Sequence, residues 1–147
     1  MYQRILVPTD GSALSKKATR GAIELAKALG AELVALHVVP RYPTSYFEGA
    51  VVMSPAEVAR TEKQWAEQGQ AKADGVRDAA IAQGVTARAA IARSDLVAEA
   101  IMGAARKHKC DLIVMASHGR KGIKRLLLGS ETQHVLTHST IPVLVLR

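Results

Sequence analysis

The chain has 147 residues, 48% of them hydrophobic and 22% charged, with a formal net charge of +7. This length suits one domain with a buried core, which must be aliphatic because only 3% of the residues are aromatic. No apolar run approaches the roughly 18 residues of a membrane span, Met1 opens no signal-peptide pattern, and the lone cysteine cannot form an internal disulfide, so we expect a cytoplasmic protein with no membrane partner.

The first forty residues predict a strand, a helix and a second strand. The segment Arg4–Pro8 is short, apolar and ended by proline, as buried strands often are. Turn residues 9–12 follow, and apolar residues then recur at helical spacing over residues 14–29, where Gly30 ends the helix. Residues 33–38 are again continuously apolar apart from one histidine, which predicts a second buried strand.

A proline- and tyrosine-containing loop over residues 39–54 is long enough to be a lid or a disordered excursion. It ends at Ser54 and Pro55, an N-cap followed by proline at the first helical position. The long helix that follows is expected to end at Gly84. Its predicted apolar stripe consists of Val58, Trp65, Gly69, Ala73, Val76 and Ala80.

Two glycines, Gly69 and Gly75, lie inside this long helix. Each weakens a helix by roughly 1 kcal/mol relative to alanine. We therefore expect the helix to depend on packing against the rest of the domain.

The remaining chain predicts strand, helix, strand, helix and strand. Residues 85–91 form a predicted third strand, and Ser94 with Asp95 is expected to cap the next helix. That helix should turn Leu96, Val97, Ile101 and Ala104 inward. A fourth strand is predicted over 112–116, a fourth helix from Ser130 through Leu136, and a fifth strand over 142–146.

Strict alternation of helices with continuously apolar strands indicates a parallel sheet that is covered on both faces. Because right-handed crossovers allow few topologies, we predict a single α/β domain over residues 1–147. Its open five-stranded sheet should have the Rossmann-like strand order 3-2-1-4-5. Ligands bind at the carboxyl ends of strands where the winding reverses, here between the first and fourth strands. The loops 8–12 and 116–130 are placed at that reversal.

The second of these loops carries phosphate-binding chemistry. Gly119 and the pair Gly129 and Ser130 bracket nine residues that are rich in positive charge. Glycine permits close approach, a helix start supplies N–H donors, and basic side chains supply charge. The alternative is that Gly119 only makes a turn and Ser130 only starts a helix; we favour phosphate binding. The basic residues are Arg120, Lys121, Lys124 and Arg125.

Two further side chains at these loops have open interpretations. Asp10 either binds Mg²⁺ or a nucleotide, or it caps the first helix together with Ser12. His118 either bonds a phosphate or polarises water, or it only fixes its own loop. The loop that contains Gly119 and Gly129 is not a Walker loop, because no Gly-Lys-Ser/Thr occurs. Nor is it a dinucleotide fingerprint, which would follow the first strand.

Other chemically notable residues predict no site. His134 and His138 have a metal-compatible spacing, but a third ligand is lacking and Val135 stands where a zinc peptidase has glutamate. Cys110 precedes a buried strand and is expected to be an inert thiol. No aromatics interleave with the basic residues, so we expect a solvated rim rather than a nucleic-acid site.

Taken together, segments 5–12, 36–38, 111–115 and 142–145 resemble the universal stress protein family, and the match covers essentially the whole chain. Nucleotide-binding members of that family carry a Gly-x2-Gly-x9-Gly-Ser/Thr loop. Gly119, Gly129 and Ser130 fall on this motif, and Ala116 replaces its first glycine. The resemblance implies a fold like that of the adenine nucleotide alpha hydrolases, with ATP (or AMP or ADP) and Mg²⁺ as ligands.

The resemblance also assigns residues to the two ends of the nucleotide. Asp10 is expected by the phosphates or their Mg²⁺ ion. The adenosine end is assigned to Pro8, Thr9, Val38, Met115 and Ala116. The phosphate end is assigned to His118, Gly119, Gly129, Ser130, Glu131 and Thr132.

We therefore expect an ATP-binding regulatory protein of the stress response that is not an enzyme. It is expected to form a homodimer through the apolar last strand, an edge strand of the predicted sheet. One alternative is an interaction module of the same fold that binds no nucleotide. Another is a slow ATPase or nucleotidyl-transfer enzyme, although residues 9–12 lack the histidines that such transferases place after the first strand.

Overall fold

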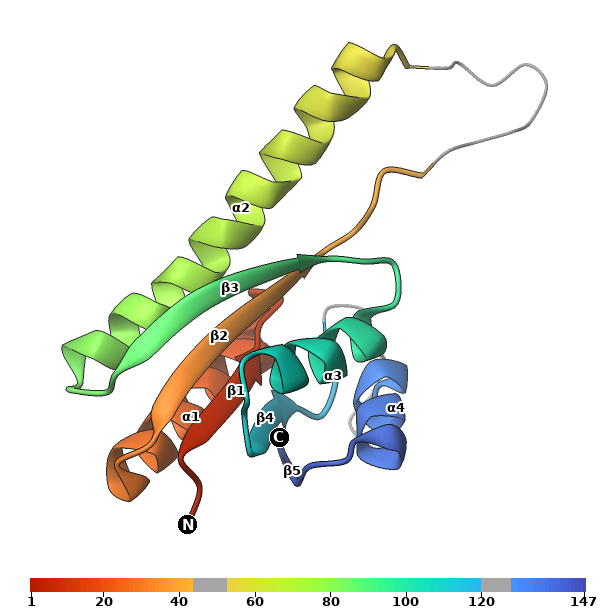
Figure 1. Cartoon of the computed structure of the whole chain (residues 1–147). Helices are drawn as coiled ribbons and strands as arrows, with labels where there is room; N and C mark the ends of the chain where they lie inside the picture. The colour runs from red at the N-terminus through yellow and green to blue at the C-terminus, as the bar shows by residue number, and fades with distance from the viewer. Residues whose placement is uncertain (44–52, 120–127) are drawn as a thin grey trace.

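The computed structural model describes residues 1–43, 53–119 and 128–147. Its five strands form one parallel sheet in the order β3-β2-β1-β4-β5, which confirms the predicted fold class (Figure 1). In chain order the elements are β1 (Arg4–Pro8), α1 (Ala13–Leu29), β2 (Glu32–Val39), α2 (Pro55–Ala82), β3 (Ala87–Arg93), α3 (Val97–Lys107), β4 (Leu112–Ala116), α4 (Ser130–His138) and β5 (Val143–Leu146).

Helices cover both faces of the sheet. Side chains alternate between the faces of a strand, so neighbouring residues of β1 belong to two different core clusters. Ile5 packs in a cluster with Ile23 of α1 and with residues of α2. Leu6 packs in a second cluster with Ile101 of α3 and Val135 of α4. The domain is therefore three layers thick, with α1 and α2 on one face and α3 and α4 on the other.

The first two helices begin at the caps that the sequence predicts. Ser12 accepts a hydrogen bond from the Ser15 N–H (3.2 Å), and Gly30 ends α1 with a φ of 65°. Ser54 and Glu57 form a reciprocal capping box at the start of α2. Each cap provides partners for N–H groups that a helix leaves unpaired at its first turn.

The predicted cap of α3 is wrong. The Ser94 N–H continues the ladder of β3 by donating to the Val39 carbonyl, and the Ser94 hydroxyl accepts from the Leu96 N–H (3.0 Å). Asp95 instead accepts from the Arg41 N–H (3.0 Å). The N-cap position falls on Leu96, which makes no side-chain cap and is 66% exposed rather than inward-facing. Strand pairing therefore uses Ser94, and a contact with the segment after β2 uses Asp95.

Only the second half of α2 is buried against the sheet. Val58 and Trp65 are half-buried, and the buried stripe begins at Gly69. Trp65 stacks on Tyr42 with the ring centroids 5.9 Å apart. Although α2 has 28 residues, neither it nor any other helix in the described part of the chain is apolar enough to cross a membrane.

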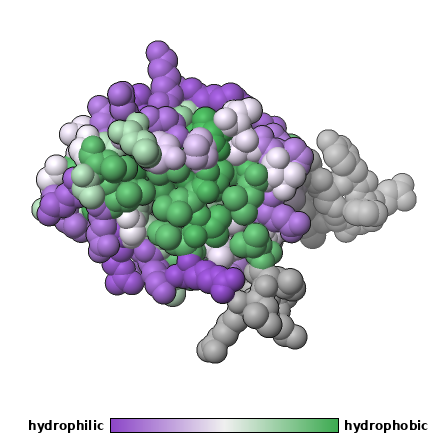
Figure 2. All heavy atoms as spheres, turned by 90° about the horizontal axis from the view of Figure 1, so that it is seen from below, coloured by the Kyte–Doolittle hydropathy of each residue, from purple (hydrophilic) through white to green (hydrophobic). Residues whose placement is uncertain are grey.

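β5 is an edge strand of the sheet, and its register pairs it with β4 alone. It lies on the lower side of Figure 1, and the view from below shows a hydrophobic patch surrounded by hydrophilic residues (Figure 2). Leu144 of β5 and Leu136 of α4 are among the exposed large apolar residues, at 40% and 41%. The edge expected to join two copies is therefore apolar and accessible.

The two glycines inside α2 have different surroundings. A Cβ atom at Gly69 would lie 2.6 Å from His37 Cδ2 and 2.9 Å from Val39 Cγ2. At Gly75 the same atom would meet nothing within 4 Å. Close packing on β2 thus requires glycine at the first position and not at the second.

We predict that Gly75→Ala raises the free energy of unfolding by roughly 0.5–1 kcal/mol, because alanine loses less backbone entropy in a helix. Gly69→Ala has the same helical gain but should lower the free energy of unfolding, because its methyl group must displace the His37 ring. Urea denaturation of both variants, analysed for midpoint and slope, measures the difference. Equal shifts in the same direction would contradict the packing described for Gly69.

Candidate functional site

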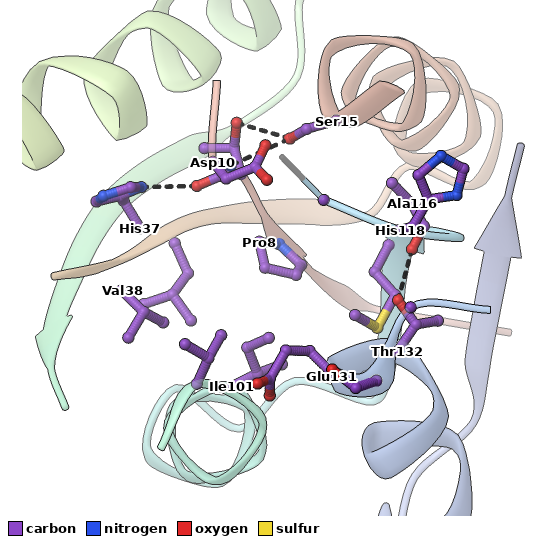
Figure 3. Close-up of a pocket in the computed structure, with 17 residues that line it drawn as sticks. Pro8, Asp10, Ser15, His37, Val38, Ile101, Ala116, His118, Glu131 and Thr132 are labelled. Carbon is purple, nitrogen blue, oxygen red and sulfur yellow. Dashed lines mark hydrogen bonds between the residues drawn. The ribbon is translucent and has the colours of Figure 1, made fainter. Parts of the chain in front are cut away.

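A pocket of about 380 Å³ lies at the carboxyl ends of β1 and β4, where the winding of the sheet reverses (Figure 3). This volume is within the range of small-molecule sites in proteins. All twelve residues that the sequence proposed for the site line the pocket: Pro8, Thr9, Asp10, Val38, Met115, Ala116, His118, Gly119, Gly129, Ser130, Glu131 and Thr132. The structure thus brings together residues from four separate segments of the chain.

Hydrogen bonds hold the loop after β1 in place. The buried Thr9 donates its N–H to the Leu36 carbonyl (2.8 Å), which extends the pairing of β1 with β2. Its hydroxyl oxygen accepts from the Ser15 hydroxyl (3.0 Å) and lies 3.3 Å from the Gly11 nitrogen. The Asp10 N–H donates to the Ser15 hydroxyl (3.2 Å). The backbone of this wall is therefore fixed by partners within the loop and on α1.

Asp10 contacts the N-cap of α1 and also lines the pocket. Its Oδ1 accepts from the Ser12 N–H (2.9 Å), so the carboxylate supports the residue that caps α1. It also lines the pocket, where it faces the loop after β4. A Cβ atom at Gly119 would lie 2.5 Å from Asp10 Oδ2. Glycine at 119 therefore leaves room for the carboxylate at the junction of the two loops.

The two ends of the loop after β4 are joined. The Gly129 N–H donates to the Ser117 carbonyl (2.8 Å), and a Cβ atom at Gly129 would lie 3.0 Å from His118 Cα. The Ser117 hydroxyl contacts His118 Nδ1 (3.1 Å), so this histidine does contact its own loop. The buried Thr132 hydroxyl donates to the Ala116 carbonyl (2.9 Å). These contacts hold the start of α4 against the end of β4.

Ala116, which replaces the first glycine of the motif, has an ordinary strand conformation. It is the last residue of β4 and pairs with Leu146 of β5. Among the non-glycine residues of the three described segments, only Lys109 has a positive φ. Alanine at position 116 therefore causes no backbone strain.

The N-terminus of α4 opens onto the pocket. Its N-cap is Gly129, which has no side chain to accept from the first N–H groups of the helix. Ser130, Glu131 and Thr132, the first three residues of the helix, line the pocket. Such N–H groups carry partial positive charge and attract anions. The predicted basic residues at 120, 121, 124 and 125 lie outside the described residues.

Another part of the pocket wall is apolar, and two of its residues were missed by sequence reasoning. Pro8, Val38 and Met115 were expected there, and Val97 and Ile101 of α3 join them. Their spacing of four residues at the start of a helix predicts only that they share a face. The sequence did place Val97 and Ile101 in the helix that connects β3 to β4, next to the reversal of winding, and this was the available signal.

His37 was also missed, together with Leu36 and Ser15. Its Nδ1 must donate, because it lies 2.7 Å from the Thr9 carbonyl oxygen, which can only accept. A polar residue near the carboxyl end of a buried strand was the signal in the sequence. His37 connects the loop after β1 with the close contact at Gly69 of α2.

The remaining candidates lie outside the pocket lining. His134 Nε2 pairs with Glu99 Oε1 (3.0 Å), and His138 Nδ1 donates to the His134 carbonyl (3.0 Å). Within the described segments, no three His, Cys, Asp or Glu residues are grouped to hold a metal ion. Burial raises the pKa of the Cys110 thiol to about 11, which agrees with the expected inert thiol.

Comparison with known proteins gives concordant matches. The model of the universal stress protein family matches residues 1–147. Universal stress protein MJ0531 of Methanocaldococcus jannaschii is 35% identical over 147 residues, covering all of this chain and 83% of that protein. Universal stress protein UspA from Lactobacillus plantarum has a TM-score of 0.81 at 24% identity, over 99% of this chain and 98% of that one. A universal stress protein solved in complex with cAMP has a TM-score of 0.71 at 28% identity, over 99% and 97%.

Proposed function

The chain belongs to the universal stress protein family, and from this membership and the pocket at the reversal of winding we propose that it is an ATP-binding regulatory protein. The observation that carries the proposal is one pocket with two unlike ends. The N-terminus of α4 lines one part of it, and apolar side chains of β1, β2, β4 and α3 line another. A phosphorylated nucleoside needs both environments.

The phosphate end is suited to an anion in three ways. The N–H groups at the start of α4 attract negative charge, and Gly119 leaves space beside Asp10. Asp10 offers the hard oxygen ligand that Mg²⁺ prefers, so it would hold the Mg²⁺ ion that accompanies ATP. The ion would also offset the negative charge that Asp10 and Glu131 place near the phosphates.

The apolar end is suited to an adenine base. Pro8, Val38 and Met115 line it from three strands, and Val97 and Ile101 line it from α3. The family relative at 28% identity that was solved with cAMP supports an adenine nucleotide in this fold.

An interaction module without nucleotide is the second reading, and Ala116 is the sequence feature that favours it. The ordinary strand conformation of Ala116 weakens that reading, because alanine adopts this backbone conformation without strain. The lone thiol of Cys110 suits a reducing compartment, so we place the proposed regulatory function in the cytoplasm.

We predict that Ser130→Asp lowers the affinity for ATP by about tenfold or more, because a carboxylate at the first position of α4 repels phosphate. The same charge favours the helix itself, so stability should not fall. Isothermal calorimetry with ATP and with adenosine measures both affinities, and adenosine binding should change little.

Substitution of Gly129 would not separate binding from folding, because any side chain there meets the His118 backbone.

Gln133→Glu is the matched control. It places the same charge in the first half of α4 at a residue that does not line the pocket. Its ATP affinity should stay near that of the wild type. Unchanged ATP affinity in Ser130→Asp would show that the start of α4 does not bind the phosphates.

We predict that ATP hydrolysis is negligible or very slow. Each group at the pocket that could act as a base has a partner within the protein. Asp10 contacts the Ser12 N–H and His118 contacts the Ser117 hydroxyl. His37 contacts the Thr9 carbonyl, and Glu131 accepts from the Ala98 N–H. A phosphate-release assay should give rates far below about 1 per second, the lower end of ordinary enzyme turnover. Turnover at that rate or faster, lost in His118→Ala, would identify an enzyme and its base instead.

We also propose that two copies pair through β5. In a parallel strand, the N–H and C=O groups of alternate residues point to the same neighbour. The Pro142 and Leu146 carbonyls accept from the Ile113 and Ser117 N–H groups on the β4 side. The backbone groups of Val143 and Val145 therefore face the open edge, where a second copy can pair with them.

We predict that Val145→Pro weakens this dimer, because proline removes an N–H from the open edge while the ladder with β4 keeps its donors. Val145→Thr is the control, since threonine keeps the N–H and the β-branched shape. Sedimentation at micromolar concentration should show a dimer for the wild type and Val145→Thr and more monomer for Val145→Pro. A monomeric wild type would contradict pairing through β5.

A further inference from the structure

The first turn of α3 lacks a cap from its own sequence. Leu96 occupies the N-cap position and makes no side-chain hydrogen bond. The hydroxyl of Ser94, two residues earlier, bonds the Leu96 backbone instead. Helix starts leave N–H groups that need partners, and such groups lower stability when they find none. A side chain from elsewhere in the chain can supply the missing acceptor.

Glu131 supplies this partner from α4. Its Oε2 accepts from the Ala98 N–H at 2.9 Å, although the two residues are 33 positions apart. Ala98 is the second residue of α3, the position that a normal N-cap side chain serves. The negative charge of Glu131 also suits the positive end of the α3 dipole. One carboxylate thus joins the starts of two helices.

The turn that Glu131 caps is part of the pocket wall. Val97 and Ile101 line the pocket on either side of Ala98, which is buried in the core between α3 and the sheet. Glu131 lines the same pocket from the other helix (Figure 3). A change in the first turn of α3 would therefore move Val97 and Ile101, which line the apolar part of the pocket.

We propose that Glu131 is a positioning residue that holds the first turn of α3 and thereby sets the affinity for the nucleoside part of the ligand. The inference rests on the proposed function for the identity of that ligand. Glu131 acts through Ala98 and the wall residues Val97 and Ile101. This role explains why an acidic residue lies beside the proposed phosphate site, where its charge alone would be unfavourable, because the carboxylate is hydrogen-bonded to α3.

A second carboxylate provides a matched control. Glu99 also joins α3 to α4, through its Oε1 contact with His134 Nε2 (3.0 Å). This pair is exposed, and neither residue lines the pocket. Loss of Glu99 removes a link between the same two helices while leaving the cap at Ala98 in place.

The test combines amide hydrogen exchange of the ligand-free protein with calorimetric titration of adenosine. Glu131→Ala should speed exchange of the Ala98 amide and lower adenosine affinity, each by about fivefold, the change expected from a lost helix cap. Glu131→Gln should restore both values, because its amide oxygen can accept the same hydrogen bond. Glu99→Ala should change neither. Circular dichroism and urea denaturation confirm that each variant is folded.

Equal Ala98 exchange in the wild type and Glu131→Ala would overturn the proposal. So would faster exchange with unchanged adenosine affinity, because the cap would then not set nucleoside binding. Failure of the wild type to bind adenosine and ATP would overturn the proposed function and the affinity effect together. In that case, Ala98 exchange would still decide separately whether Glu131 caps α3.

Discussion

The reversal of winding between β1 and β4 is the constraint on which the site depends. From β1 the chain continues to β2 and β3 through α1 and α2, which cover one face of the sheet. It then reaches β4 and β5 through α3 and α4, which cover the other face (Figure 1). The loops that leave the carboxyl ends of β1 and β4 must therefore diverge. No connecting helix passes between these two loops, because they lead to opposite faces of the sheet, and the pocket lies in the space between them.

Hydrogen bonds then convert this space into a shaped site. Thr9 is tied to β2, Gly129 to the end of β4, and Thr132 to the Ala116 carbonyl. Each such bond contributes only about 1 kcal/mol to stability, but an unpaired buried group would cost as much or more. The described residues of these loops are thereby held in place before any ligand arrives, which reduces the entropy that binding must overcome. Glycine at the N-cap adds no side-chain acceptor to the positive end of α4, which lines the pocket.

The fold and much of the pocket were predictable because their signals are local. Apolar strands, helix caps and the order of elements define the sheet, and the sheet order places loops 8–12 and 116–130 together. Residues were missed where their role depends on distant partners. His37 is oriented by the Thr9 carbonyl, and α3 is capped by Glu131 rather than by Ser94. No single segment of the sequence contains both members of these pairs.

The most direct test of the central claim is an NMR titration of the ¹⁵N-labelled protein with ATP and Mg²⁺. The account predicts chemical-shift changes at the ends of β1 and β4, in the first turns of α3 and α4, and near Val38. Amides at the opposite end of the sheet, around Asp111, should stay unchanged. Shifts centred away from the pocket, or none at millimolar ATP, would contradict nucleotide binding at the reversal of winding.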